Sequence, residues 1–257
     1  MVLFRITKIE IGDKALEKLE IYKSENIVLN DAFDQAVMNL HILKKQNGYK
    51  SFVICGCEAG DGATTVAINL AAAMADSGWK TVLIDGDMRK KNTYKRLNEK
   101  ASVGLSDNLL GKASLKDIIY ETTTENLSYI PCGELIDNPV RLLCSSKMNE
   151  VRDELSETFD FIIYDMPAVN SAMDAKVISV NVDATILVSA IGKTSKAGLV
   201  EAANTLNEVK ANLIGTIINK TDMDQYSSLH KDYDYFLEER YAKNKSKKRK
   251  AKRLLIQ

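Results

Sequence analysis

A glycine-rich stretch, Gly56–Thr65, contains the residue types in this 257-residue sequence that point most directly to chemistry. Glycines let successive backbone N–H groups point at an anion, and a helix that starts behind them adds the positive end of its dipole. A threonine hydroxyl at the start of that helix is suited to hold Mg²⁺. The stretch therefore predicts a phosphate site, whose expected contacts are Gly60, Asp61, Gly62, Thr64 and Thr65.

Acidic residues stand at the ends of two further apolar runs. Asp85 and Asp87 close one run, and Asp165 closes the other. Carboxylates in such places can serve a ligand site, and they can equally cap helices or pair with basic side chains. Arg89, two residues after Asp87, is either part of the same site or a surface charge. The residues alone leave both alternatives open.

The elements that would position these residues are visible in the apolar pattern. Ser51–Cys55 is typical of a central strand in a parallel sheet, and Val66–Ser77 is rich in alanine with apolar residues at helical spacing. Gly78 is a typical helix stop, and Thr81–Asp85 predicts the next strand. Strand, glycine loop and helix in this order form the phosphate-binding arrangement of P-loop proteins.

The loop departs from the P-loop pattern G-x-x-x-x-G-K-[ST] at its lysine. Gly62 and Thr64 match, whereas Cys57 replaces the first glycine and Ala63 replaces the lysine. That lysine reaches the β- and γ-phosphates, and a unit charge about 4 Å away is worth roughly 4 kcal/mol at an effective dielectric constant near 20. Its loss would weaken nucleotide binding about a thousandfold unless another cation compensates. The candidate cations are Lys90, Lys91 and Lys193.

The rest of the chain alternates helices and strands. Asn30 is expected to cap a helix over Asp31–Lys45, whereas Leu3–Ile11 has strand-like alternation and Lys14–Tyr22 has the composition of a short helix. The alternation of helices with strands along the chain predicts an α/β fold with a doubly wound, mostly parallel sheet. The glycine loop and the acids would then gather at the carboxyl ends of the strands, called here the carboxyl edge of the sheet. Further helices are expected at 104–110, 115–120, 140–144, 146–158, 174–180 and 195–209, and further strands at 127–131, 159–165, 184–190 and 213–219.

Composition narrows the class of protein. Hydrophobic residues make up 45% and charged residues 27%, which suits one α/β domain with a substantial core. Four cysteines without CxxC spacing indicate a reducing cytoplasm rather than a disulfide framework. Apolar runs stay well below 18 residues, so neither a transmembrane helix nor a signal peptide is expected.

The charge is uneven along the chain. Basic and acidic residues are equal at 35 each, but Arg240–Gln257 holds nine Lys and Arg and no acid. A run of this kind is commonly a solvated tail, and it can also touch anionic lipid. No base-reading motif accompanies it, so a specific nucleic-acid partner is not expected.

Several short motifs accompany the glycine loop. They are Asp85-Gly-Asp87-Met-Arg89, Tyr164-Asp165-Met-Pro167, Gly104–Lys112, Asn138–Ser145, Val182–Val188 and Gly215–Lys220. Together with the loop, this set resembles the bacterial tyrosine kinases of capsule and exopolysaccharide synthesis, whose fold is that of the MinD/ParA-type ATPases. The resemblance runs from about Asn30 to Lys220. It implies a P-loop NTPase-like fold. It also implies that the protein binds ATP or ADP together with Mg²⁺.

The resemblance also implies roles for residues at matching positions. The implied ligands of Mg²⁺ are Thr64, Asp87 and Asp165. The implied catalytic residues are Asp85, Asp87 and Arg89, with the acids activating the attacking hydroxyl. Asn219, at the end of the last expected strand, would contact the nucleotide.

Tyrosines gather near the C-terminus. The last 32 residues contain Tyr226, Tyr233, Tyr235 and Tyr241. They are either solvated or packed aromatic residues or, as the resemblance implies, acceptors phosphorylated within a homo-oligomer or by an active paralogue. Gram-positive members of the family are cytoplasmic chains switched on by a membrane adaptor protein at the inner face of the plasma membrane. We therefore expect three regions: an arm at 1–29, a kinase-like domain at 30–221 and a tyrosine-bearing basic tail at 222–257.

A second departure concerns assembly. The family carries E-x-x-R-x-x-R on the helix before the P-loop, where it mediates ring formation, and the matching residues here are Asp31, Asp34 and Val37. With Ala63, this leaves a tyrosine kinase of weak or no activity and a non-catalytic pseudokinase that binds the adaptor as alternatives. A partitioning-type ATPase is disfavoured, because Glu58 replaces the signature lysine of that group.

Overall fold

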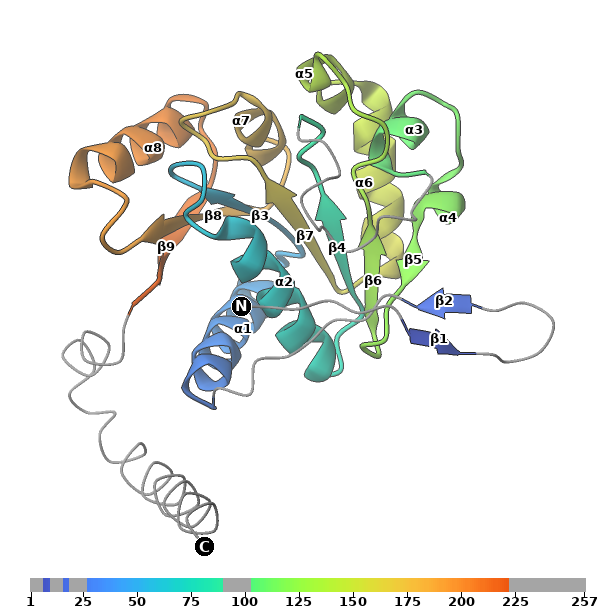
Figure 1. The fold of residues 1–257 in the computed structure, drawn as a ribbon, viewed down its shortest axis with the longest axis horizontal. Coiled ribbons are helices and arrows are strands. Elements are labelled where there is room, and N and C mark those ends of the chain that lie inside the picture. Colours follow the sequence, from blue (N-terminus) through green and yellow to red (C-terminus); the bar gives the residue numbers. More distant parts are fainter. Residues whose placement is uncertain (1–6, 10–15, 19–26, 90–102, 222–257) are drawn as a thin grey trace, which may run out of the picture. The chain divides into compact units, whose positions relative to one another are not determined.

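The structure is a computed structural model that describes residues 7–9, 16–18, 27–89 and 103–221. The chain divides into two units, Met1–Asn219 and Lys220–Gln257, and the fold described below is that of the first. Figure 1 shows its central sheet with helices on both faces. The four tail tyrosines, the basic run and the segment 90–100 lie outside the described residues.

Seven strands form the sheet in the order β5-β6-β4-β7-β3-β8-β9. All neighbours are parallel except β5 and β6. Every residue of β3, β4, β7 and β8 is buried, as expected for strands covered on both faces. The prediction of a doubly wound, mostly parallel α/β sheet is confirmed. The strands are β3 (Ser51–Gly56), β4 (Thr81–Asp85), β5 (Tyr120–Glu121), β6 (Leu127–Ile130), β7 (Phe161–Met166), β8 (Ala184–Ala190) and β9 (Leu213–Asn219).

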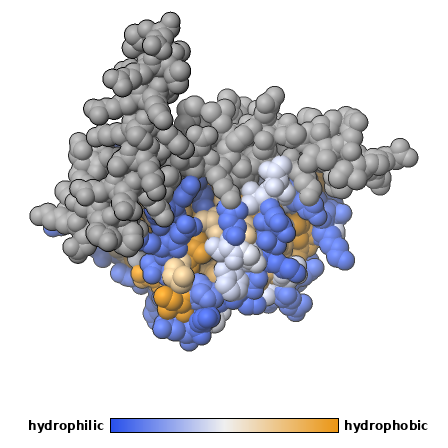
Figure 2. All heavy atoms as spheres, turned by 90° about the horizontal axis from the view of Figure 1, so that it is seen from below, coloured by the Kyte–Doolittle hydropathy of each residue, from blue (hydrophilic) through white to orange (hydrophobic). Residues whose placement is uncertain are grey.

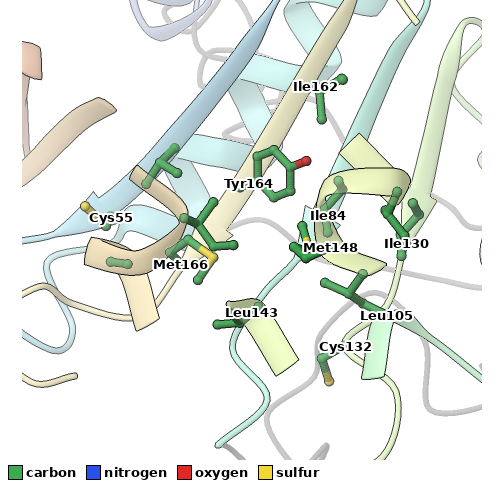
Figure 3. Packing of buried hydrophobic residues seen from close by; sticks show 14 of the residues in the cluster. Cys55, Ile84, Leu105, Ile130, Cys132, Leu143, Met148, Ile162, Tyr164 and Met166 are labelled. Carbon is green, nitrogen blue, oxygen red and sulfur yellow. The ribbon is translucent and has the colours of Figure 1, made fainter. Parts of the chain in front are cut away.

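Apolar side chains alternate between two clusters, one on each face of the sheet. Phe52 and Ile54 of β3 belong to the cluster with α1 (Ile27–Asn47) and α2 (Ala63–Asp76), whereas Cys55 belongs to the other. Figure 3 shows part of this second cluster, in which side chains from the sheet meet side chains from the helices. Its helices are α3 (Leu105–Leu109), α4 (Leu115–Ile118), α5 (Pro139–Leu143), α6 (Ser146–Thr158), α7 (Asp174–Ser179) and α8 (Lys196–Glu208).

Three local predictions are wrong. The helix α1 begins at Ile27, so Asn30 lies inside it, because one asparagine in a helix costs only about 0.7 kcal/mol relative to alanine. Leu16–Lys18 forms strand β2, antiparallel to β1 (Thr7–Ile9), where composition predicts a helix. Tyr120–Glu121 forms β5 instead of ending a helix. In both strands, pairing with a nearby segment outweighs a weak local helix preference.

The helix α1 presents apolar side chains in both directions. Val37, which stands where the family has the second arginine of its assembly motif, is 5% exposed and packs in the core against the sheet. Met38 and Ile42, one turn apart, are 58% and 43% exposed. On the face drawn in Figure 2, hydrophobic residues form small patches among hydrophilic ones. No helix within the described ranges is long and apolar enough to cross a membrane.

Candidate functional site

The glycine loop joins β3 to α2 at the carboxyl edge of the sheet. Asp61 closes its turn, because its N–H donates to the Glu58 carbonyl at 3.2 Å and its Oδ2 accepts from the Glu58 N–H at 2.8 Å. Gly62 is the N-cap of α2, and its carbonyl accepts from the Val66 N–H at 3.0 Å. The N–H groups of the three residues between them therefore have no acceptor within their own helix. This is a donor set suited to a phosphate.

Two loop positions need glycine. The backbone dihedral φ is +84° at Gly60 and +92° at Gly62, in the left-handed region. Asn219, at the end of β9, donates from Nδ2 to the Asp61 carbonyl at 2.8 Å, and a Cβ on Gly62 would collide with that nitrogen. The last strand is thus tied to the loop, and the nucleotide contact of Asn219 stays a prediction.

We expect Gly62→Ala to destabilise the protein more than Gly78→Ala. Gly78, which follows α2, also has a positive φ of +88°, but a Cβ there would meet nothing within 4 Å. Gly78→Ala should cost about 1 kcal/mol from backbone strain alone. Gly62→Ala should cost about 2–4 kcal/mol, because it must also displace Asn219. Urea unfolding measures both, and equal losses would contradict a bracing role of Asn219.

The three predicted acids come together at the same edge. Asp85 and Asp165 are Cα partners across β4 and β7, and Asp165 is paired with Ile54 on the β3 side. Asp87 follows two residues after Asp85, and its N–H donates to Asp85 Oδ1 at 3.1 Å. Each of the three acids is at most 4% exposed. The parallel sheet therefore gathers carboxylates from two strands beside the strand that leads into the loop.

The donors at this edge fit Mg²⁺ in kind. Thr64 is half-buried at the start of α2, next to the exposed Thr65, and Asp87 and Asp165 supply carboxylates. Mg²⁺ binds hard oxygen ligands, keeps several waters and shares phosphate oxygens. In the part of the chain that the structure describes, no group of three or more His, Cys, Asp or Glu side chains is arranged to hold a metal. A metal here would therefore need the Thr64 hydroxyl, water and phosphate oxygens as ligands in addition to the two carboxylates.

Arg89 forms a two-pronged ion pair with Asp174, the first residue of α7. Nε lies 2.6 Å from Oδ2 and Nη2 lies 2.9 Å from Oδ1. The Asp174 side chain is fully buried and that of Arg89 is 40% exposed. Hydrogen bonding to Asp174 raises the pKa of the Arg89 guanidinium. Sequence reasoning missed Asp174, whose one signal was its place at the start of an expected helix, and the catalytic role of Arg89 stays a prediction.

Removing Arg89 should destabilise the fold. In Arg89→Ala the buried Asp174 carboxylate loses its partner, which we expect to cost about 2–3 kcal/mol, less than for a fully buried pair because water reaches the site. Lys147→Ala breaks an exposed pair with Glu150 and should cost under about 0.5 kcal/mol. The shift in urea midpoint compares them. A loss no larger than that of the control would show that Asp174 finds another partner.

Two cysteines at the site carry protonated thiols. Burial raises the pKa of Cys57 to about 11, helped by Asp61, and burial also raises the pKa of Cys55. At pH 8, iodoacetamide should therefore label exposed Cys144 at least about 100-fold faster than Cys57. Peptide mass spectrometry measures the labelling, and fast labelling of Cys57 would indicate that the loop opens.

The same two thiols predict how stability depends on pH. The free energy of unfolding should fall as the pH rises from 9 to 11, because thiols in the unfolded chain lose protons that the folded thiols keep.

Three lysines are candidates to replace the missing P-loop lysine, and the structure describes one of them. Lys90 and Lys91 lie outside the described residues. Lys193 follows β8, and its Nζ donates to the Ala59 carbonyl in the glycine loop. The structure therefore brings one of the three candidates to the site.

Comparison with known proteins decides the family. The family model described as an AAA domain matches residues 50–237. Tyrosine-protein kinase CpsD of Streptococcus pneumoniae serotype 4 is 34% identical over 175 residues, which cover 68% of this chain and 77% of CpsD. This chain belongs to the bacterial tyrosine-protein kinases. Tyrosine-protein kinase YwqD of Bacillus subtilis is 31% identical over 198 residues, 77% of this chain and 82% of YwqD. The predicted family is confirmed.

Solved structures agree on the fold of this tyrosine-kinase family member. The chimerical protein CapA2B2 superposes with a TM-score of 0.71 at 27% identity, over 79% of this chain and 93% of that chain. The septum site-determining protein MinD of Pyrococcus horikoshii, solved with Mg-ADP, superposes with a TM-score of 0.53 at 26% identity, over 66% and 70%. The predicted P-loop NTPase-like fold is therefore confirmed.

Proposed function

We propose that this protein is a Mg²⁺-dependent tyrosine kinase that transfers the γ-phosphoryl group of ATP to its own C-terminal tyrosines and regulates capsule or exopolysaccharide synthesis. The observation that carries the proposal is the meeting of a phosphate-type loop with Asp85, Asp87 and Asp165 at one sheet edge. Membership of the tyrosine-kinase family supports the choice of acceptor. The proposed acceptors are Tyr226, Tyr233, Tyr235 and Tyr241.

Each group at the edge has a task in this proposal. Backbone N–H groups of Gly62–Thr65 hold and orient the terminal phosphates. In this proposal Asp85 and Asp87 take the tyrosine proton as the new phosphorus–oxygen bond forms and the bond to the departing ADP breaks. Bound Mg²⁺ supplies neutralisation of phosphate charge. Its proposed ligands are Thr64, Asp87 and Asp165.

The proposed activity is slow. Ala63 stands at the first helical position of α2, where the P-loop pattern places its lysine. The charge that would follow the phosphoryl group in the transition state is therefore missing from the loop itself. Phosphoryl transfer relies on positioning and charge neutralisation, so this loss lowers the rate more than the binding of ATP.

The test is to incubate the purified full chain with Mg-ATP, with and without the cytoplasmic segment of its adaptor. Mass spectrometry should find phosphate on the four tail tyrosines, with a rate that rises when the segment is present. Calorimetric titration with Mg-ATP and Mg-ADP should show binding in the same samples. Absence of tail phosphate in both conditions would remove the kinase proposal.

A non-catalytic pseudokinase that binds the membrane adaptor is the second candidate. It is favoured by Ala63 and by Val37, a core residue at the second arginine position of the family's assembly motif. The likeness to the chimerical protein CapA2B2 supports a partner of this kind. This candidate predicts adaptor binding that ATP leaves unchanged, and a strict nucleotide requirement would eliminate it.

A partitioning-type ATPase is the third and weakest candidate. Glu58 holds the place of that group's signature lysine, and a Cβ on Gly198 would come within 2.7 Å of its Oε1, so the carboxylate lies beside the start of α8. An acid is electrostatically suited to that helix end. Light scattering that finds a monomer with and without ATP would eliminate this candidate.

We place the protein in the cytoplasm, at the inner face of the plasma membrane through its adaptor. In this arrangement residues 1–29 form an arm, 30–221 the kinase-like domain and 222–257 the acceptor tail. The basic run of the tail adds contact with anionic lipid. The tyrosines of the tail also reach the active site of a second copy or of an active paralogue.

A further inference from the structure

The turn after β8 has a defined backbone. The Lys193 and Thr194 N–H groups donate to the Ala190 carbonyl at 3.1 and 2.9 Å. The Ala190 N–H donates to Thr194 Oγ1 at 2.9 Å, and the Ile191 N–H donates to the Asn219 carbonyl at 3.0 Å. These bonds tie the turn to itself and to β9. The Cα of Lys193 therefore has a fixed place at the carboxyl edge of the sheet.

The Lys193 side chain extends from this turn over the glycine loop. Its Nζ donates to the Ala59 carbonyl and lies 3.9 Å from Asp61 Oδ1. A Cβ built on Gly60 would come within 2.6 Å of the same nitrogen. The ammonium group is therefore in contact with three successive residues of the loop, although 133 positions separate Lys193 from Gly60.

Asp61 shows why a cation belongs there. Its carboxylate is fully buried, and Oδ2 is used by the Glu58 N–H. Oδ1 is buried and accepts no hydrogen bond from the described residues. A buried negative charge within an anion-binding loop opposes phosphate binding unless a positive charge offsets it. Ala63 brings none, and Arg89 is engaged by Asp174.

We propose that Lys193 is the phosphate-binding cation of this site and contacts the terminal phosphates of a bound nucleotide, in place of the lysine missing at Ala63. The proposal rests on the nucleotide binding proposed above. The Lys193 side chain is 39% exposed, so its ammonium group is accessible to a ligand. A lysine on a flexible four-carbon stem can exchange the Ala59 carbonyl for a phosphate oxygen without moving the backbone.

The test compares Lys193→Met with Lys196→Met in calorimetric titrations of Mg-ATP and Mg-ADP against the full chain. Lys196 is an exposed lysine three residues further on, at the start of α8, so it controls for loss of a nearby charge. We expect Lys193→Met to weaken Mg-ATP binding about 10- to 100-fold and Lys196→Met less than about twofold. Equal binding by the natural chain and Lys193→Met would overturn the inference while leaving the proposed function standing.

Asp61→Asn combined with Lys193→Met separates phosphate contact from simple neutralisation of Asp61. If Lys193 contacts phosphate, the double variant stays weak. Binding restored to the natural level would show that Lys193 only neutralises Asp61 and would overturn the inference. Absence of binding by the natural chain itself would remove nucleotide use, and the inference with it.

Discussion

Asp87→Asn should lower phosphate incorporation into the C-terminal tyrosines at least about a thousandfold. Asp87 is 1% exposed and belongs both to the proposed Mg²⁺ ligands and to the proton acceptors. Its Oδ1 accepts from the Arg89 N–H at 3.3 Å, a bond that an asparagine oxygen can still accept. The substitution therefore removes one of the three negative charges of the site while leaving the local backbone in place.

The measurement is quantitative mass spectrometry of tail peptides after incubation with Mg-ATP, made in the natural chain and in the faster Ala63→Lys background. Asp153→Asn is the control, because Asp153 is an exposed acid on α6 paired with Arg152. It should phosphorylate at the parent rate. Tail phosphorylation that persists in Asp87→Asn would mean that a contaminating or partner kinase performs the transfer.

Ala63→Lys should tighten Mg-ATP binding about 10- to 100-fold and raise tail phosphorylation by a larger factor. The added ammonium lies at the start of α2, next to Thr64 and the helix N–H groups that have no intrahelical acceptor. The full thousandfold gain expected for an isolated charge is reduced, because Lys193 already places a positive charge on the loop. The rate gains more than the affinity, since charge on the transferred group develops in the transition state.

Calorimetry and tail phosphorylation measure both effects. Ala197→Lys adds the same charge to the first turn of α8 and should change binding less than about twofold. In a Lys193→Met background the gain from Ala63→Lys should be larger, because two cations that serve one phosphate are not additive. A gain that is equal for Ala63→Lys and Ala197→Lys would show that net charge matters and that the loop does not cradle phosphate.

The order of elements and the site edge follow from the sequence alone. Apolar runs such as Ser51–Cys55 are buried on both faces, so their pattern is strong, and a parallel strand must deliver its carboxyl end to one edge. That rule predicted Asp85 and Asp165 beside the glycine loop, and the structure makes them Cα partners. The missing lysine at Ala63 was also visible, because the motif has fixed spacing.

The weak local patterns needed the structure. An asparagine at an N-cap stabilises a helix by only about 1 kcal/mol, which neighbouring residues can outweigh, so α1 starts earlier than Asn30. The strand at Tyr120–Glu121 exists because β6 offers it an edge, and a two-residue strand has no periodicity to detect. None of these differences involves a residue of the glycine loop or one of the three acids of the site.

Tertiary structure alone decided which charges meet. Arg89 and Asp174 are 85 positions apart, and Lys193 lies 134 positions from Ala59, so no spacing rule links them. Burial then determines how much each ion contact stabilises the protein. The fully buried carboxylates of Asp61 and Asp174 require a nearby cation, whereas the same groups in water would not. The sequence determined that this chain has a phosphate-type loop without its lysine. The fold determined that Lys193 stands over that loop.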